Sequence, residues 1–216
     1  MSAQTRLDRD GDYDGIAFNG LDLGGQTGSN ARFLDCSFTD CDFDGTVLRR
    51  ARLVDCLFER VRSADLDVAE SSWLDTAVTG SRLGAVRAFG AEWTRVRIEG
   101  GKVDYLNLRD ARLADVLLTG CVLGELDLAG ATVKRLVVDD CRVGRLDVSG
   151  ATLKEVDLRG ADLSGLAGLA SLSGATISSS QLVELAPALA AHVGLVVSDR
   201  QRTGRQRTGR QRRDEG

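Results

Sequence analysis

A five-residue period runs through most of this chain. Counting in fives from Phe18 to Leu163, every residue numbered three above a multiple of five is large and apolar, except Gly28, Ser63 and Ala88. With three exceptions among 30 positions, 27 obey the rule. A period of five fits neither the 3.6 residues of an α-helical turn nor the two-residue repeat of a strand. The sequence is therefore an internal repeat, and the repeat decides the fold.

A second position, two residues before each of these, is also small or apolar. Between positions 16 and 161 it holds 17 small residues, 12 Leu, Val or Ile residues and Gln26. From Ala91 onward small and bulky residues alternate strictly there. All five cysteines occupy this position: Cys36, Cys41, Cys56, Cys121 and Cys141. We therefore expect two inward columns that interdigitate large with small residues, with cysteine acting as a small hydrophobe rather than in a disulfide or metal site.

The repeating unit resembles that of the pentapeptide-repeat family. Units such as Ala31-Arg-Phe-Leu-Asp35 and Ala111-Arg-Leu-Ala-Asp115 carry this resemblance, which covers about 150 residues without a break in register. Membership implies an all-β fold, a right-handed quadrilateral parallel β-helix with one pentad on each face and twenty residues in each coil. Thirty pentads then form seven and a half coils, stacked about 4.8 Å apart.

The chain divides into four segments: an N-terminal segment (1–15), the β-helix (16–165), a C-terminal cap with a helix (166–198) and an Arg-rich tail (199–216). In the third segment we expect a helix capped by Ser180, ended by Gly194 and kinked or divided by Pro187. A short strand is expected over residues 195–197. The apolar face of the expected helix comprises Leu182, Leu185, Ala186, Leu189 and Val193.

Two interpretations of this helix stay open. A solenoid must cover its open end, and an apolar helix face would do so. The same face would also join two chains end to end. Gly174-Ala-Thr-Ile177 and the helix after it resemble the C-terminus of the mycobacterial gyrase-inhibiting type of the family, in which this segment dimerises. The resemblance therefore implies a homodimer and a capping or dimerisation helix.

The tail is a second, unrelated repeat of Arg-Thr-Gly-Arg-Gln without an apolar residue, which predicts disorder. Its seven Arg, against Asp199, Asp214 and Glu215, give +4, so the remainder of the chain carries −8 if the total is −4. Two interpretations remain, a dispensable solvated extension and a weak electrostatic contact with nucleic acid.

Acidic residues gather in the first half of the chain. Residues 1–75 hold 15 acids and 8 bases, whereas residues 76–198 hold 14 and 13. Asp35, Asp55 and Asp75 are spaced by one coil and would form a single column. Either these acids form an ordinary solvated face, or they bind a partner. The candidate partner-binding residues are Asp35, Asp40, Asp42, Asp44, Asp55, Asp65, Asp67 and Asp75.

The family suggests the second interpretation, because some of its members imitate duplex DNA with ordered carboxylates. The unbroken register leaves no inserted loop, so the chain resembles the loopless actinobacterial DNA-gyrase-inhibiting, fluoroquinolone-resistance type. This implies a DNA-mimicking protein that binds and modulates DNA gyrase or topoisomerase IV, with resistance to quinolones or other gyrase poisons as the consequence. The alternative is a non-enzymatic scaffold with a different protein partner.

An enzyme is not expected. His192 is the only histidine, and no phosphate-loop or metal-ligand spacing is present, so no catalytic residue, cofactor or metal is expected. No 18-residue apolar run occurs, and the segment from Met1 to Asp14 lacks the apolar stretch of a secretory signal. We expect a cytoplasmic protein that does not enter a membrane, with a rod that does not bind DNA directly.

Overall fold

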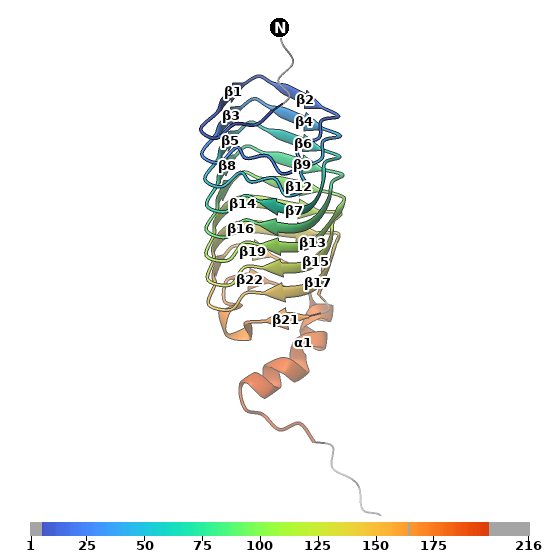
Figure 1. Ribbon diagram of the computed structural model, residues 1–216. Coiled ribbons are helices and arrows are strands. Elements are labelled where there is room, and N and C mark those ends of the chain that lie inside the picture. Colours follow the sequence, from blue (N-terminus) through green and yellow to red (C-terminus); the bar gives the residue numbers. More distant parts are fainter. Residues whose placement is uncertain (1–5, 164, 199–216) are drawn as a thin grey trace, which may run out of the picture.

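The computed structural model describes residues 6–163 and 165–198, which form a parallel β-solenoid of about eight coils followed by one helix (Figure 1). Strand residues pair with residues 20 positions later, as Phe18 does with Phe38 and Trp73 with Trp93. The predicted fold class is confirmed. The tail and its predicted disorder lie outside the described residues.

Each coil has four sides, and short strands mark them. The first side carries β1 (Asp12–Asp14), β3 (Arg32–Leu34), β5 (Arg52–Val54), β8 (Ser72–Leu74) and β11 (Glu92–Thr94). The second side carries β2 (Ala17–Asn19), β4 (Ser37–Thr39), β6 (Leu57–Glu59), β9 (Ala77–Thr79) and β12 (Arg97–Glu99). Later coils extend these sides through β14 (Arg112–Thr119), β16 (Thr132–Asp139), β18 (Thr152–Lys154), β19 (Val156–Asp157) and β22 (Ala175–Thr176).

A second sheet covers the other two sides and bends around the corner between them. Its strands are β7 (Arg62–Asp67), β10 (Arg82–Arg87), β13 (Lys102–Asn107), β15 (Val122–Asp127), β17 (Cys141–Asp147), β20 (Ala161–Leu163) and β21 (Leu166–Ala167). In the first coils only isolated bridges, such as Asp22 with Asp42, hold these sides.

Stacked aromatic rings fill the N-terminal half of the interior. The rings of Phe18, Phe38 and Phe58 stack with centroid distances of 4.6 and 4.7 Å. Trp73 and Trp93 continue the stack at 5.1 Å. Because each coil places the same position above its equivalent in the coil before, large rings in one column are forced into this offset stacking, which favours the register beyond simple burial.

The three exceptions to the repeat are accommodated inside the rod. A side chain at Gly28 would lie 2.9 Å from the Leu48 methyl group, so Leu48 of the next coil occupies that space. Ser63 is buried, and its hydroxyl donates to the Phe43 carbonyl at 3.0 Å. Ala88 is completely buried. The five cysteines are buried and unbridged, as expected from their inward position.

The corners of the coils require left-handed backbone. Corner residues at multiples of five have positive φ, among them Asp35 (50°), Asp55 (53°) and Arg60 (51°) as well as glycines such as Gly20 (61°). Aspartate and asparagine tolerate this region better than other residues with a side chain. Part of the acidic pattern therefore has a conformational origin.

The stacking continues past residue 165. Leu166 of β21 pairs with Leu146, and after η1 (Leu169–Ser171) Ala175 of β22 pairs with Val156, an offset of 19 rather than 20. Helix α1 (Ser179–His192) then projects from the end of the rod (Figure 1).

Ser178, and not Ser180, caps α1. Its hydroxyl accepts from the Gln181 amide nitrogen at 3.2 Å, and the Gln181 side chain accepts from the Ser178 nitrogen at 2.7 Å, a capping box. The Gln181 side-chain nitrogen also donates to the carbonyls of Leu158 and Ala161, both at 2.7 Å, which ties α1 to the last coil. Gln181 thus satisfies both the helix end and exposed carbonyls of the solenoid.

Pro187 lies inside α1 and does not divide it, so of the two alternatives expected there the division was wrong and the kink stays a prediction. The expectation of a strand over residues 195–197 was wrong, and in Figure 1 the chain after α1 leads away from the rod and its sheets. Gly194 does end the helix, with φ 79°, as expected for a residue after a C-cap.

We predict that Gly84→Ala destabilises the rod more than Gly20→Ala does. A Cβ at Gly84 would lie 2.3 Å from the Ala64 carbonyl oxygen, a backbone atom that cannot move without breaking the stacking. At Gly20 nothing lies within 4 Å, and only the left-handed φ opposes alanine. We expect losses in the free energy of unfolding of about 2 kcal/mol or more at Gly84 and about 1 kcal/mol at Gly20. Urea unfolding of both variants measures this, and equal losses would contradict it.

Candidate interaction surface

The column of corner residues that begins with Asp35 changes charge along the rod. From the second coil onward it reads Asp35, Asp55, Asp75, Arg95, Asp115, Arg135 and Glu155. The arginines pair with the aspartates one coil before them: Arg95 donates from Nε and Nη2 to Asp75 at 2.5 and 2.7 Å, and Arg135 pairs with Asp115. The C-terminal half of this column, from Asp75 onward, is therefore a ladder of ion pairs.

These partners lower the pKa of the carboxyl groups. The hydrogen bond from Arg95 holds the pKa of Asp75 below its ordinary value, and the hydrogen bonds from Arg135 and Arg60 do the same for Asp115 and Asp40. Arg60 reaches Asp40 with two bonds of 2.9 Å each. Asp40 and Asp75 are therefore engaged within the rod.

Asp42 and Asp44 bond to the backbone. The Asp42 carboxylate accepts from the Asp44 nitrogen at 2.9 Å and from Arg62 Nε at 2.9 Å, and both lower its pKa. The Asp44 carboxylate accepts from the backbone nitrogens of Ala64 and Asp65 in the next coil, at 3.0 and 3.2 Å. Both residues stabilise the corners in which they lie.

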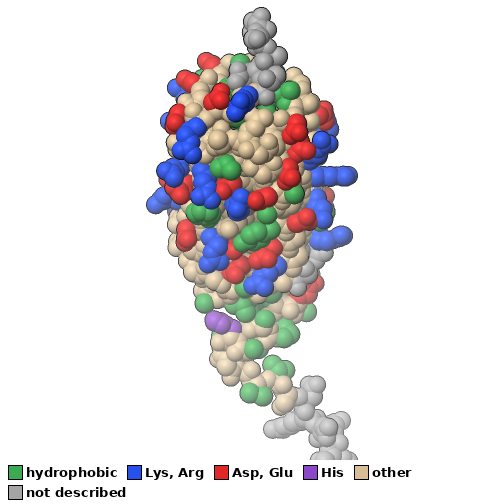
Figure 2. Space-filling model, in the orientation of Figure 1, with side chains coloured by type: hydrophobic (Ala, Val, Ile, Leu, Met, Phe, Trp, Pro, Cys, Tyr) green, Lys and Arg blue, Asp and Glu red, His purple; other side chains and the backbone are tan. Residues whose placement is uncertain are grey.

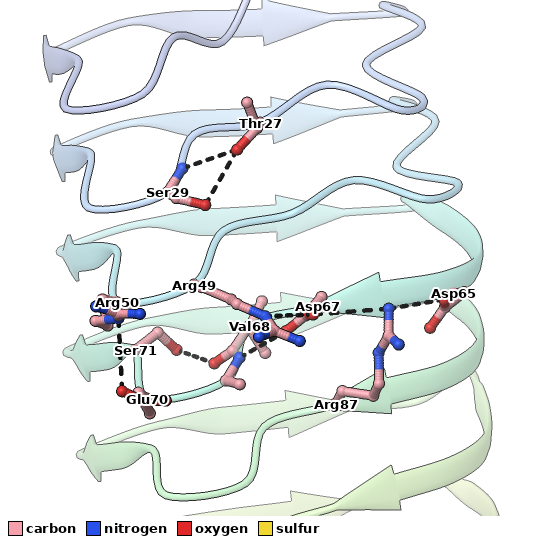
Figure 3. Close-up of polar contacts among 11 residues, drawn as sticks. Thr27, Ser29, Arg49, Arg50, Asp65, Asp67, Val68, Glu70, Ser71 and Arg87 are labelled. Atoms are coloured by element: carbon pink, nitrogen blue, oxygen red, sulfur yellow. Dashed lines mark hydrogen bonds and ion pairs between the residues drawn. The ribbon is translucent and has the colours of Figure 1, made fainter.

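Asp67 lies inside the surface, contrary to the outward position that the repeat suggested. Its side chain is only 3% exposed, accepts from Arg49 Nε at 2.7 Å and lies 3.7 Å from Arg87 (Figure 3). It also accepts from the Ala69 nitrogen at 3.2 Å. Asp65 pairs with the same Arg87 at 2.8 Å. A buried carboxylate held by two arginines and a backbone amide is part of the rod and is not available to a partner.

Asp35 and Asp55 remain free. Both are exposed, and neither has an ion-pair partner among residues 6–163 and 165–198. They occupy the same corner of adjacent coils, where the stacked backbone places them about 4.8 Å apart. The half-buried side chains of Leu34 and Val54 lie directly before them in the chain. Of the eight candidate acids, these two are the only ones whose carboxylates, among the described residues, have neither an ion pair nor a backbone bond.

Charges of both signs are mixed over the rod. Figure 2 shows acidic and basic side chains interspersed on the visible face, without an unbroken acidic stripe. Ladder pairs such as Glu92 with Arg112 at 3.1 Å account for much of this pattern. The net negative charge of residues 1–75 is therefore available to a partner mainly at acids that have no ion pair.

An apolar surface lies at the C-terminal end. Of the predicted interface residues, Leu182 is 51% and Val193 67% exposed, Ala186 is exposed, and Leu185 and Leu189 are half-buried. Val183, Leu195, Val196 and Val197 add to the exposed apolar side chains. We call this set, from Leu182 to Val197, the terminal apolar surface.

Within the described ranges, no three His, Cys, Asp or Glu side chains gather closely enough to hold a metal ion. No helix among these residues is long and apolar enough to span a membrane.

Comparison with known proteins agrees with the repeat. A family model described as pentapeptide repeats matches eight copies over residues 18–62. No curated protein matches the chain. Among solved structures, HetL of the cyanobacterium Nostoc sp. strain PCC 7120, involved in heterocyst differentiation regulation, is 18% identical with a TM-score of 0.32 over 82% of this chain and 92% of that one. A trypsin-treated variant of QnrB1, a plasmid-mediated fluoroquinolone resistance protein, is 20% identical with a TM-score of 0.33 over 89% and 95%.

The protein is thus a solenoid of stacked five-residue units with one unit on each side of a twenty-residue coil. Residues 18–62 of this solenoid match the pentapeptide-repeat family model, so the chain is similar to the proteins of that family.

We predict that Arg95→Gln weakens the rod at neutral pH and that the loss shrinks in acid. The pKa of Asp75 is lowered in the folded state, so the pair stabilises the fold fully above the unfolded aspartate pKa of about 3.9, and this stabilisation is lost as the pH falls through the lower folded value. Removal of Arg95 also takes an attractive charge from Asp55 and Asp115, the acids that electrostatically interact with it besides Asp75.

Urea unfolding of both proteins at pH 7 and near pH 3 in low salt measures the difference. Arg52→Gln is the control, because Arg52 is exposed and has no ion-pair partner in the described part of the chain. A loss that stays constant across this pH range would contradict the ladder of ion pairs.

Proposed function

We propose that this protein is a non-catalytic binding protein whose free carboxylates Asp35 and Asp55 take the place of DNA phosphates on a basic, DNA-binding surface of a type II topoisomerase. DNA gyrase and topoisomerase IV are the partners to test first. The observation that supports this is the pair of unpaired acids at one corner of two successive coils, in the described part of a rod whose other candidate acids are bonded internally.

The spacing supports imitation of a phosphate row. Stacked corners place the two residues about 4.8 Å apart along the rod, compared with a rise of about 3.4 Å along the helix axis for each phosphate of one DNA strand. A groove lined by Arg and Lys attracts such a row at long range and increases the rate of association. Because the charge density is lower than that of DNA, we expect binding that depends on the fit of the rod as well as on charge.

The shape of the surface and the pKa values of its acids support a binding role and not a catalytic one. The acids with lowered pKa, such as Asp40 and Asp75, are paired with arginine on a convex surface, and lowered values keep them ionised at neutral pH. A general acid or base needs a pKa near the working pH. These residues therefore suit structure and recognition.

The second candidate function is an interaction scaffold for another protein. The mixed charges on the rod favour it, because ion-pair ladders leave alternating signs and half-buried aliphatic residues such as Leu34 and Val54 beside the free acids. Protein interfaces combine an apolar centre with a polar, charged rim.

We predict that the purified protein inhibits gyrase supercoiling and that Asp35→Asn with Asp55→Asn weakens this at least tenfold. Loss of two charge-assisted contacts of about 1.5–3 kcal/mol each would exceed tenfold. Asparagine retains the shape and also tolerates left-handed backbone, so the corner conformation is kept. A supercoiling titration with and without a quinolone measures the effect.

The matched control is Asp110→Asn with Asp140→Asn, which removes two exposed, unpaired acids at left-handed corners (φ 55° and 48°) elsewhere on the rod. The control should inhibit like the original protein. If the original has no effect on gyrase or topoisomerase IV at tens of micromolar, the topoisomerase proposal fails and the scaffold remains.

We propose in addition that the terminal apolar surface joins two copies of the chain. Leu182 and Val193 are more than half exposed and Val196 is 91% exposed, which is unfavourable for a surface left in water. α1 projects beyond the last coil, so a second helix has access to it (Figure 1). Two rods joined end to end would double the length available to a partner.

We predict that Leu182→Lys with Val193→Lys converts a dimer to a monomer. Two ammonium groups in an apolar contact would be buried without partners, which is strongly unfavourable. Sedimentation velocity of the full chain measures the mass. Leu57→Lys, at a residue 36% exposed on the side of the rod, is the control and should leave the mass unchanged. A monomeric original protein would contradict this proposal without touching the role of Asp35 and Asp55.

A further inference from the structure

A hollow of about 240 Å³ lies on the N-terminal half of the rod, at a different corner from Asp35. It is lined by Arg9, Ser29, Asn30, Arg49 and Arg50. Each of these side chains can donate hydrogen bonds, and no carboxylate is in the lining. The space is far larger than the ~10–15 Å³ that one water molecule needs. We propose that this hollow binds an oxyanion of phosphate size, either free phosphate or a small phosphate ester.

The stacking of coils creates the hollow. Arg9, Ser29 and Arg49 occupy the same position of three successive coils, which backbone bonds hold in register: Asp10 nitrogen to Ser29 oxygen at 2.9 Å and Asn30 nitrogen to Arg49 oxygen at 2.8 Å. The small Ser29, only 8% exposed, leaves a gap between two arginines about two coil spacings, or ~10 Å, apart. A tetrahedral anion in the gap would meet one guanidinium group from each side.

The buried Asp67 holds Arg49 through a single nitrogen. Asp67 bonds only to Nε of Arg49, so its two terminal nitrogens have no hydrogen bond among the described residues. Figure 3 shows Asp67 beside Arg49, and shows Glu70 on the side of Arg50 away from Ser29. The carboxylate of Glu70 is 3.5 Å from Arg50 Nε. These acids fix the arginines without entering the hollow.

Arg9 is the cation without compensation. It is exposed and has no ion-pair partner within the described ranges. Arg49 and Arg50 are each paired with a carboxylate, so Arg9 supplies the uncompensated charge of the hollow. An oxyanion would be attracted to Arg9 and would accept from the terminal nitrogens of Arg49 and from Ser29, whereas Asn30 already donates one amide hydrogen to Asp10 at 3.0 Å. The hollow therefore suits an anion better than it suits water.

A larger hollow on the rod lacks this chemistry. It has a volume of about 960 Å³ and contains Arg62, Arg82 and Lys102, but Asp42, Asp44 and Asp104 also line it. Those carboxylates would repel an oxyanion, and Lys102 already pairs with Asp104 at 2.7 Å. Of these two hollows, only the smaller one is lined by donors alone.

The test is calorimetric titration of the full chain with inorganic phosphate in low chloride, together with the melting temperature at rising phosphate. We expect one phosphate per chain and a melting temperature that rises with ligand concentration. Arg9→Gln should weaken binding about tenfold or more, because it removes one charge-assisted contact and no internal bond. Arg52→Gln, a matched loss of one unpaired arginine elsewhere, should bind phosphate like the original protein.

The outcomes separate a built site from diffuse attraction. Equal weakening by Arg9→Gln and Arg52→Gln, or no rise in melting temperature at millimolar phosphate, would overturn the proposal. If a nucleoside monophosphate binds more tightly than inorganic phosphate, the oxyanion site is supported and a phosphate ester is the ligand. If the two affinities are equal, the site is supported and free phosphate is the ligand. Since the Arg-rich tail is present in every variant, its own attraction for phosphate cancels from the comparison.

Discussion

The hydrogen bonds between coils, made in a fixed register of twenty residues, are the interaction on which the rest of the structure depends. They place every residue directly above its equivalent in the previous coil, as with Phe18 and Phe38. Inside the rod this is favourable, because flat rings and aliphatic side chains stack on their own kind. Outside the rod it is unfavourable, because charges of one sign would also stack at about 4.8 Å. The distribution of charge on the protein surface therefore depends on how the sequence avoids stacking like charges.

Alternation of charge along a column is the main solution. Arg95 follows Asp75 and Arg135 follows Asp115, so each cation lies one coil after an acid. The arginine must lie twenty residues after the acid, one coil further along the rod. A column of repelling carboxylates then becomes a ladder of ion pairs. Where it is absent, as between Asp35 and Asp55 or at Arg9, a charge has no ion-pair partner among the described residues, and a bound partner or ion would compensate it. We regard such unrelieved positions as the best guide to function on a surface of this kind.

The sequence predicted the coil, the inward positions and the buried cysteines, because one five-residue rule governs all of them. It did not reveal which acids are free. Asp67 stands at another position of the repeat than Asp35, and its burial was not apparent because Arg49 is 18 residues from it and meets it only through the coil. Comparing columns twenty residues apart would have found the pairing of Asp75 with Arg95 and the arrangement of Arg9, Ser29 and Arg49. The cap at Ser178 was missed because Ser178, Ser179 and Ser180 offer three equivalent side chains, and only the bond of Gln181 to the last coil selects one.

The conformation of the corners limits what the acids alone can mean. Asp35 and Asp55 lie in left-handed backbone, where aspartate is favoured whether or not a partner exists. Conformation, however, explains the residue type and not the missing counter-charge, since Asp40 and Asp75 occupy the same kind of corner and are each paired with arginine. An arginine in the coil after Asp55 would stabilise the column, and the chain has Asp75 there instead. The left-handed turn therefore does not account for three successive acids with the first cation only at Arg95, and the basic partner surface that we propose for Asp35 and Asp55 would account for them.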